Sequence, residues 1–172
     1  MRVAVFYSSR NGQTRKILET LLQGQPDAQV EWYDLHQYPK KNLTKYDKVL
    51  IGASIRYGHF HPSLESFIQG HLEQLKAVDA NLIGVCLTAR KPEKATPKTN
   101  PYMRKLLARV AWHPQRAAVF AGALRYSQYN WWQTRIIQLI MKMTGGQTDT
   151  SVDVELTDWA AVEEFGRQLW SR

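Results

Sequence analysis

The chain has 172 residues, of which 44% are hydrophobic and 22% are charged, a composition typical of folded globular proteins rather than disordered ones. The formal net charge is +8, and Cys86 is the only cysteine, which excludes an intramolecular disulfide. No run approaches the roughly 18 to 20 apolar residues that span a bilayer, so we expect one domain over residues 1–172, soluble or attached to a membrane surface.

The first predicted elements are a buried strand, a tight turn and a helix. Residues 3–7 are uniformly apolar, and the polar turn Ser-Ser-Arg-Asn-Gly follows them. Apolar residues then recur with helical spacing over 17–22. Side chains that alternate over 30–34 indicate a second strand, and residues 35–47 are expected to be mostly irregular.

The middle of the chain continues the alternation of strands and helices. Residues 48–54 and 82–87 are predicted to be buried strands, and Pro62 between them suits the first position of a helix. A further helix is predicted over 97–111 and a fifth strand over 117–123. The apolar face of the helix after Pro62 is predicted from its spacing to consist of Leu64, Phe67, Ile68, His71, Leu72 and Leu75.

Residues 124–150 do not fit a plan of five strands and their helices. They include many apolar and aromatic residues, among them Trp131 and Trp132, and a Gly-Gly pair near the end suits a helix C-cap. The apolar stripe of this segment is wide for an ordinary surface helix. A last helix is predicted over 159–169, with Thr157 as its N-cap.

The order of these elements predicts an α/β fold. Strands that are apolar throughout and alternate with helices indicate a parallel sheet covered on both faces. Five such strands suit the doubly wound order 2-1-3-4-5, in which ligands bind at the carboxyl ends beside the first strand. We therefore expect the site on the loops after the first, third and fourth strands.

The turn after the first strand carries residue types that bind a phosphate. Free N–H groups at a helix start, together with the helix dipole, favour an anion, and Gly12 permits close approach of the backbone. The turn lacks the Gly-Lys-Ser/Thr ending of nucleoside triphosphatases and the dinucleotide fingerprint. A polar turn before a helix also occurs without any ligand. The candidate residues are Ser9, Arg10, Asn11, Gly12, Gln13 and Thr14.

This turn resembles the phosphate loop of flavodoxins, which surrounds the terminal phosphate of FMN with hydroxyl side chains and backbone N–H groups. Ser9, Gly12 and Thr14 stand at matching positions. Asn11 replaces the usual Thr, and Arg10 departs from the pattern and could point to solvent. The resemblance implies a flavodoxin-like domain with FMN as its cofactor.

Two further loops complete the flavin site that the resemblance implies. In the first, Tyr57 is a candidate for stacking on the flavin ring, and Arg56 for a place near its pyrimidine edge. No carboxylate or cysteine accompanies His59 and His61 at ligand spacing, so no metal site is expected, and both could be loop histidines without a role. The candidates from the two loops are Ser54, Ile55, Arg56, Tyr57 and Gly58 after the third strand, and Thr88, Ala89 and Arg90 after the fourth.

Longer stretches resemble one flavodoxin-like family more closely, the quinone-dependent protoporphyrinogen IX dehydrogenases of bacterial haem biosynthesis. The most specific segments are residues 51–59, 89–94, 121–126 and 140–149. The resemblance covers nearly the whole chain. It implies that FMN accepts electrons from protoporphyrinogen IX and passes them to a quinone, either menaquinone or ubiquinone. It also implies a peripheral location on the cytoplasmic side of the inner membrane, or otherwise a cytoplasmic one, and leaves a homo-oligomer open.

The distribution of charge and apolar residues suits such a substrate. Residues 89–116 contain eight Lys and Arg residues against Glu93 alone. Such a zone attracts anionic lipids, nucleic acids or acidic small molecules, although a solvated basic helix face gives the same pattern. Long-chain flavodoxins carry an insertion in the fifth strand; we place 124–150 there, with 152–156 completing the strand. We expect this insertion to form the porphyrinogen or quinone site or to rest on the membrane, the alternative being a helix packed over the sheet edge.

The sequence does not single out a catalytic base. Arg56, His59, Arg90 and Lys91 are candidates on loops near the expected flavin, although direct hydride transfer would need no base. Three other functions compete: an electron-carrier flavodoxin, a flavodoxin-like NAD(P)H:quinone reductase and a nucleic-acid-binding module. Carriers are usually acidic, which the charge of +8 opposes, and no nucleotide fingerprint supports the reductase. Without a nucleic-acid-binding motif, no nucleic-acid partner is expected.

Overall fold

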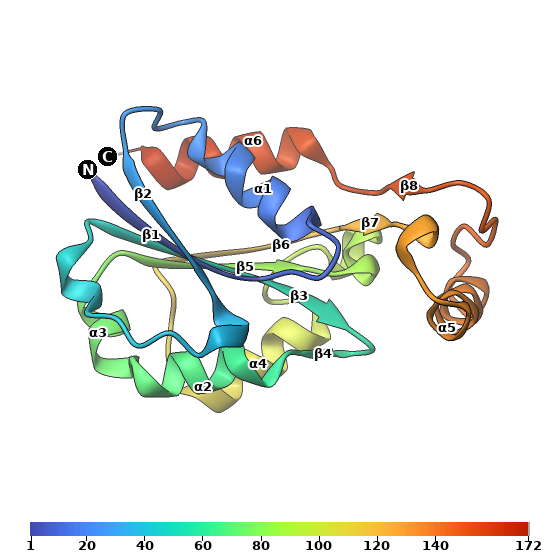
Figure 1. Cartoon of the computed structure of the whole chain (residues 1–172), viewed down its shortest axis with the longest axis horizontal. Coiled ribbons are helices and arrows are strands. Elements are labelled where there is room, and N and C mark those ends of the chain that lie inside the picture. Colours follow the sequence, from blue (N-terminus) through green and yellow to red (C-terminus); the bar gives the residue numbers. More distant parts are fainter. Residues whose placement is uncertain (172) are drawn as a thin grey trace.

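The computed structural model describes residues 1–171, in which five parallel strands form the central sheet (Figure 1). Their order is β2-β1-β3-β5-β6, which confirms the expected doubly wound arrangement once the parallel strands alone are counted. The strands are β1 (Arg2–Ser8), β2 (Gln29–Asp34), β3 (Lys48–Arg56), β5 (Ala80–Val85) and β6 (Arg116–Phe120).

Helices cover both faces of the sheet, which explains why the inner strands β1, β3 and β5 are buried along most of their length (Figure 1). Alternate residues of β1 face opposite sides: Val3 and Val5 pack in one core, and Ala4 and Phe6 in the other. The first face carries α1 (Gln13–Leu22) and α6 (Trp159–Trp170); the second carries α2 (Pro62–Gly70), α3 (Leu72–Ala77) and α4 (Pro101–Val110).

Two helices differ from the sequence prediction. The single helix predicted through 64–75 is broken at His71, whose φ of −122° and ψ of 16° are not helical and separate α2 from α3. The helix predicted over 97–111 begins only at Pro101, because the side chain of Asn100 caps it by accepting hydrogen bonds from two N–H groups of its first turn.

The segment after β6 also corrects the prediction. The fifth strand ends at Phe120, and β7 (Ala123–Leu124) then pairs antiparallel with β8 (Val154–Glu155) in a separate two-stranded ribbon. The prediction that 152–156 completes the fifth strand is therefore wrong, because the returning segment pairs with β7 alone. The insertion contains a short 3-10 helix, η5 (Tyr126–Gln128), and α5 (Trp131–Met143), which lies beyond the carboxyl ends of the strands rather than on a face of the sheet (Figure 1).

The remaining short elements shape the loops around the carboxyl ends of the strands. The hairpin strand β4 (His59–Phe60) folds back antiparallel on the end of β3. The N-cap of α6 is Asp158 and not Thr157, whose hydroxyl instead donates to the Ala121 carbonyl at 2.8 Å. The other 3-10 helices are η1 (Leu35–Gln37), η2 (Leu43–Lys45), η3 (Leu87–Arg90) and η4 (Pro92–Lys94). Within residues 1–171, no helix combines the length and the apolar character needed to cross a bilayer.

Candidate functional site

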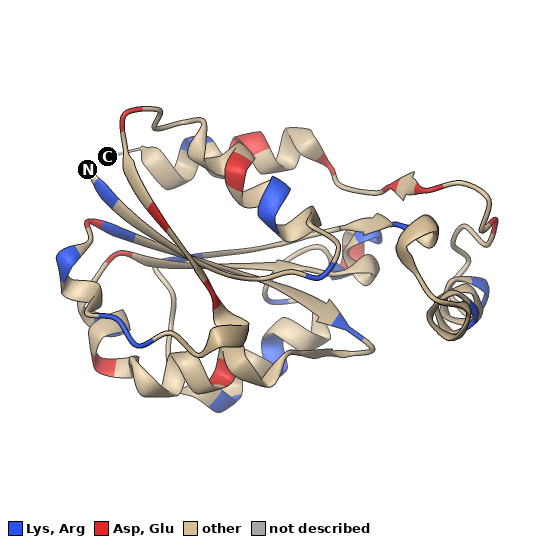
Figure 2. Cartoon of the chain, viewed as in Figure 1, with Lys and Arg blue, Asp and Glu red and all other residues tan. Residues whose placement is uncertain are grey.

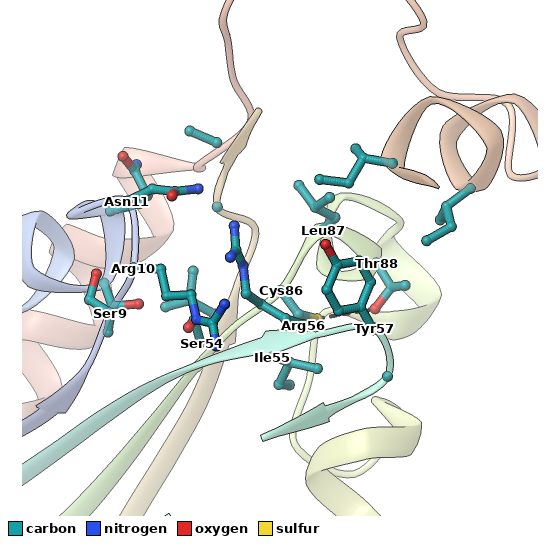
Figure 3. Close-up of a pocket in the computed structure, with 18 of the residues that line it drawn as sticks. Ser9, Arg10, Asn11, Ser54, Ile55, Arg56, Tyr57, Cys86, Leu87 and Thr88 are labelled. Atoms are coloured by element: carbon teal, nitrogen blue, oxygen red, sulfur yellow. Dashed lines mark hydrogen bonds between the residues drawn. The ribbon is translucent and has the colours of Figure 1, made fainter. Parts of the chain in front are cut away.

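A cavity of about 470 Å³, referred to below as the main cavity, lies at the carboxyl ends of β1, β3 and β5 (Figure 3). Its volume falls within the roughly 300–1,000 Å³ of small-molecule and cofactor sites. The turn before α1, the β3–β4 hairpin, the loop after β5 and the insertion supply its walls. The sequence-predicted residues that line it are Ser9, Arg10, Asn11, Gln13, Thr14, Ser54, Ile55, Arg56, Tyr57, Gly58 and Thr88.

The turn before α1 presents an uncapped helix start to the main cavity. Gly12 adopts a φ of 80°, and a Cβ at this position would meet no atom within 4 Å, so conformation rather than crowding favours glycine. Its N–H donates to Ser9 Oγ at 3.1 Å, which folds the turn. Among residues 1–171, no side chain caps α1, so the N–H groups of its first turn remain available to an anion.

The side chain of Gln13 ties this turn to the base of the insertion. Its Nε2 donates to Glu155 and, at 2.9 Å, to Thr157 Oγ1, while its Oε1 accepts from Arg125 Nη2 at 3.0 Å. Arg125 also pairs with Glu155 at 3.2 Å. Gln13 therefore has its polar groups engaged in the fold, although its side chain lines the main cavity.

The β3–β4 hairpin places a basic and an aromatic side chain at the main cavity. Tyr57 and Gly58 both have positive φ, which turns the chain sharply after β3. The Tyr57 side chain is 46% exposed and is available to stack on a planar ligand. Figure 3 shows the side chains of Arg10 and Arg56 lying between the turn and the hairpin. The guanidinium of Arg56 also lies 5.9 Å from the ring centroid of Tyr129 in the insertion.

The insertion supplies an apolar wall. Ile136, Ile137 and Ile140 of α5 line the main cavity. The helix is held there by a small core of its own, composed of Leu124, Tyr126, Ile137 and Met141. The main cavity thus has N–H groups that can donate hydrogen bonds to an anion at one end, and apolar surface along α5. This arrangement suits a flat apolar molecule with an anionic tail.

Three predicted cofactor residues lie away from the walls of the main cavity. Gly12 shapes the turn without lining the cavity, and Ala89 is buried. Arg90 instead binds two separate segments together. Its Nη1 donates to the Leu87 carbonyl at 2.9 Å, and its Nη2 donates to Thr144 Oγ1, just after α5, at 2.6 Å. We therefore assign Arg90 to positioning the insertion.

Of the four candidate catalytic residues, Arg56 alone lines the main cavity. His59 lines a smaller cavity beside it, and Lys91 lines neither. The basic zone of residues 89–116 is not one patch, because it runs from the carboxyl ends of the strands to the start of β6, at the amino ends of the strands. Figure 2 shows basic residues on the turn before α1, at the end of β3, after β7 and on α5.

The structure adds site residues that the sequence did not reveal. Cys86, predicted to be a buried small hydrophobe, is 4% exposed but lines the main cavity, and its sulfur accepts from Asn100 Nδ2 at 3.3 Å. Its place after the fourth parallel strand was the available signal. Tyr102 and Tyr129 reach the main cavity from α4 and the insertion, and no local motif marks either of them.

Comparison with known proteins gives a consistent result over nearly the whole chain. Residues 4–151 match the flavodoxin domain family. Protoporphyrinogen IX dehydrogenase (quinone) of Escherichia coli strain K12 is 43% identical over 171 residues, with 98% of this chain and 94% of that protein covered. The protein of the same name from Leishmania major is 42% identical over 164 residues, with 94% of this chain and 71% of that protein covered.

The solved structures support the fold. The solution structure of two-electron reduced Megasphaera elsdenii flavodoxin superimposes with a TM-score of 0.50 at 16% identity, covering 68% of this chain and 84% of that one. At this identity the likeness concerns the arrangement of the sheet and helices alone.

Proposed function

The chain belongs to the flavodoxin-domain family of quinone-dependent protoporphyrinogen IX dehydrogenases, and we propose that it oxidises protoporphyrinogen IX to protoporphyrin IX with FMN as cofactor and a quinone as electron acceptor. The observation that carries this proposal is the main cavity, which joins an uncapped helix start to an apolar wall supplied by the insertion.

The residues of the main cavity fit FMN. Ser9, Thr14 and the first-turn N–H groups of α1 would hold its phosphate, since an uncapped helix start binds an anion without a basic side chain. Tyr57 and Leu87, which both line the main cavity, would flank its ring system. Bound FMN supplies the capacity to accept and release electrons, which no side chain of the main cavity provides.

The chain itself contributes binding and orientation rather than proton abstraction. No Asp, Glu or His is among the residues of 1–171 that line the main cavity. The isoleucines of α5 exclude water and offer apolar contact to a tetrapyrrole, and Arg56 places a positive charge beside it. We therefore expect protons from the substrate to leave to solvent without a dedicated base.

The exposed face of α5 supports a further part of the proposal, docking on the cytoplasmic surface of the inner membrane, where menaquinone or ubiquinone resides. Five large apolar side chains of this helix are exposed: Trp131 is 61% exposed, Trp132 69%, Ile136 43%, Leu139 58% and Met143 77%. Apolar surface of this kind, with Arg135 and Lys142 on the same helix, is typical of helices that lie in a bilayer interface. The same helix lines the main cavity, so a docked protein would bring a membrane quinone close to the flavin.

Anaerobic turnover tests the proposed reaction. The FMN-loaded protein is mixed with protoporphyrinogen and a short-chain quinone, and the fluorescence of protoporphyrin is followed. We expect product to form only when both quinone and FMN are present. NADPH offered with the same quinone should give no turnover. Steady oxidation of NADPH without oxidation of protoporphyrinogen would favour the NAD(P)H:quinone reductase instead.

Flotation with anionic lipid vesicles tests the docking. Replacing both tryptophans (Trp131→Ser with Trp132→Ser) should move the protein from the vesicle fraction to the free fraction. Tyr38→Ser, at another exposed aromatic residue (55%), serves as the control and should leave binding unchanged. Equal flotation of the tryptophan double variant and the wild-type protein would refute docking through α5.

A further inference from the structure

A second cavity of about 90 Å³, called here the histidine pocket, lies beside the main cavity. The two cavities share four lining residues, so they are neighbours with a common wall, and that wall includes both Arg10 and Arg56. Three of the five histidines of the chain line the histidine pocket: His36 from η1, His59 from β4, and His61 at the start of α2. The flavin site described above uses none of these three histidines.

The imidazoles of the histidine pocket are held by specific contacts. The ring centroids of His36 and His61 are 4.2 Å apart, and His36 Nε2 forms a hydrogen bond of 2.8 Å with the buried Ser8 Oγ. His61 Nδ1 accepts the N–H of Ser63 at 3.2 Å, so the neutral ring carries its proton on Nε2. Within residues 1–171, that Nε2 makes no hydrogen bond, which leaves it as a donor.

The charges around the histidine pocket favour an anion. Arg10 and Arg56 are the two guanidinium groups in its wall. No Asp or Glu of residues 1–171 lines the pocket, and a carboxylate oxygen of Asp34 lies 3.9 Å from His36 Nδ1. Burial, with the neighbouring His36 and Arg10, lowers the pKa of His61, which keeps this ring a neutral donor. A volume of about 90 Å³ admits a group of a few atoms and not a ring system.

We propose that the histidine pocket binds a carboxylate of the substrate while the tetrapyrrole ring lies over the bound flavin, against the apolar wall that α5 gives the main cavity. This inference rests on the proposed function, since protoporphyrinogen carries two propionates. Arg10 and Arg56 belong to both cavities, and a guanidinium donates well to a carboxylate. The flavin phosphate does not compete for this pocket, because the phosphate binds at the start of α1 in the proposed FMN site. The histidine pocket would therefore select tetrapyrroles with a free acid at the right position and orient the ring.

Equilibrium binding to the FMN-loaded protein tests this inference, with protoporphyrin IX and its dimethyl ester as probes and fluorescence quenching as readout. The variants are His61→Asn, which preserves a side chain able to cap α2, and Arg10→Gln. His113→Gln is the control, because this exposed histidine precedes β6 and lies at the amino ends of the strands, away from the histidine pocket. We expect the wild-type protein to bind the diacid about tenfold more tightly than the ester, the effect of one charge-assisted hydrogen bond.

In the two variants this preference should fall to about twofold or less, with affinity for the ester unchanged in both and affinity for FMN unchanged in His61→Asn. A preference that persists in both variants overturns the inference. Equal binding of both probes by the wild-type protein overturns it as well, even if protoporphyrinogen is turned over and the proposed function stands. Loss of FMN from His61→Asn would assign the histidine pocket to the cofactor and overturn the inference. A wild-type protein that neither binds porphyrins nor oxidises protoporphyrinogen removes the proposed function, and the inference with it.

Discussion

Replacing Arg90 with Met should loosen the C-terminal end of α5, the helix whose middle turns line the main cavity. The guanidinium donates to Leu87 O at 2.9 Å, to Thr144 Oγ1 at 2.6 Å and to Thr144 O at 3.3 Å. A hydrogen bond to a charged group contributes about 1.5–3 kcal/mol. Because one half-buried guanidinium shares these three bonds, we assign about 2–3 kcal/mol to the set. At about 1.4 kcal/mol per factor of ten, the end of α5 would open roughly 30- to 150-fold more often.

Amide hydrogen exchange measures this opening directly. In Arg90→Met, exchange should accelerate over the last turn of α5 and residues 144–146, while β1, β3 and β5 remain protected. Lys98→Met removes an exposed basic residue of the same basic zone and should leave the exchange of α5 unchanged. Exchange in Arg90→Met within twofold of wild type would refute the positioning role. A large loss in the rate of flavin reduction without faster exchange would instead restore Arg90 as a catalytic residue.

Three further substitutions test other parts of the structure. Gly12→Ala should lower the free energy of unfolding, measured in urea, by about 1–2 kcal/mol, because a residue with a Cβ is strained at a φ of 80°. Gly12→Asn should lower it by less, and an Ala variant as stable as the wild-type protein would contradict this. Because the pKa of His61 is lowered in the folded protein, unfolding takes up a proton and the free energy of unfolding falls as the pH drops below about 6.5. His61→Asn should reduce this loss of stability between pH 7 and pH 5, and an equal loss in the variant and the wild-type protein would disprove the assignment. Met141→Ala, at a fully buried position, should destabilise the local core of the insertion by about 2–5 kcal/mol. Proteolysis of the insertion should become faster while the urea midpoint of the sheet is unchanged, and an insertion that stays as resistant to proteolysis as in the wild-type protein would contradict this.

The central sheet could be predicted because its inner strands β1, β3 and β5 are buried on both faces. Residues 48–54 and 82–87 are continuous apolar runs, and such runs followed by helical periodicity leave few topologies other than a doubly wound one. The phosphate turn could also be located, because it combines a strand end, a glycine and a helix start. These signals are local, and each covers only a few residues.

The insertion and its contacts could not be predicted in the same way. The strands β7 and β8 have two residues each, too few to show any periodicity, so the return of the chain was placed in the wrong strand. Arg90 was assigned to the flavin from its position after a strand, whereas its partner Thr144 lies 54 residues away. The histidine pocket brings His36 next to His61 through the packing of η1 against α2, and no sequence pattern links the two.

Rapid anaerobic mixing of the FMN-loaded protein with excess protoporphyrinogen IX tests the main claim most directly, with the visible absorbance of the oxidised flavin as the signal. The account predicts that this absorbance is lost in a single turnover and returns when a quinone is added. Flavin that stays oxidised in the presence of saturating protoporphyrinogen would contradict it.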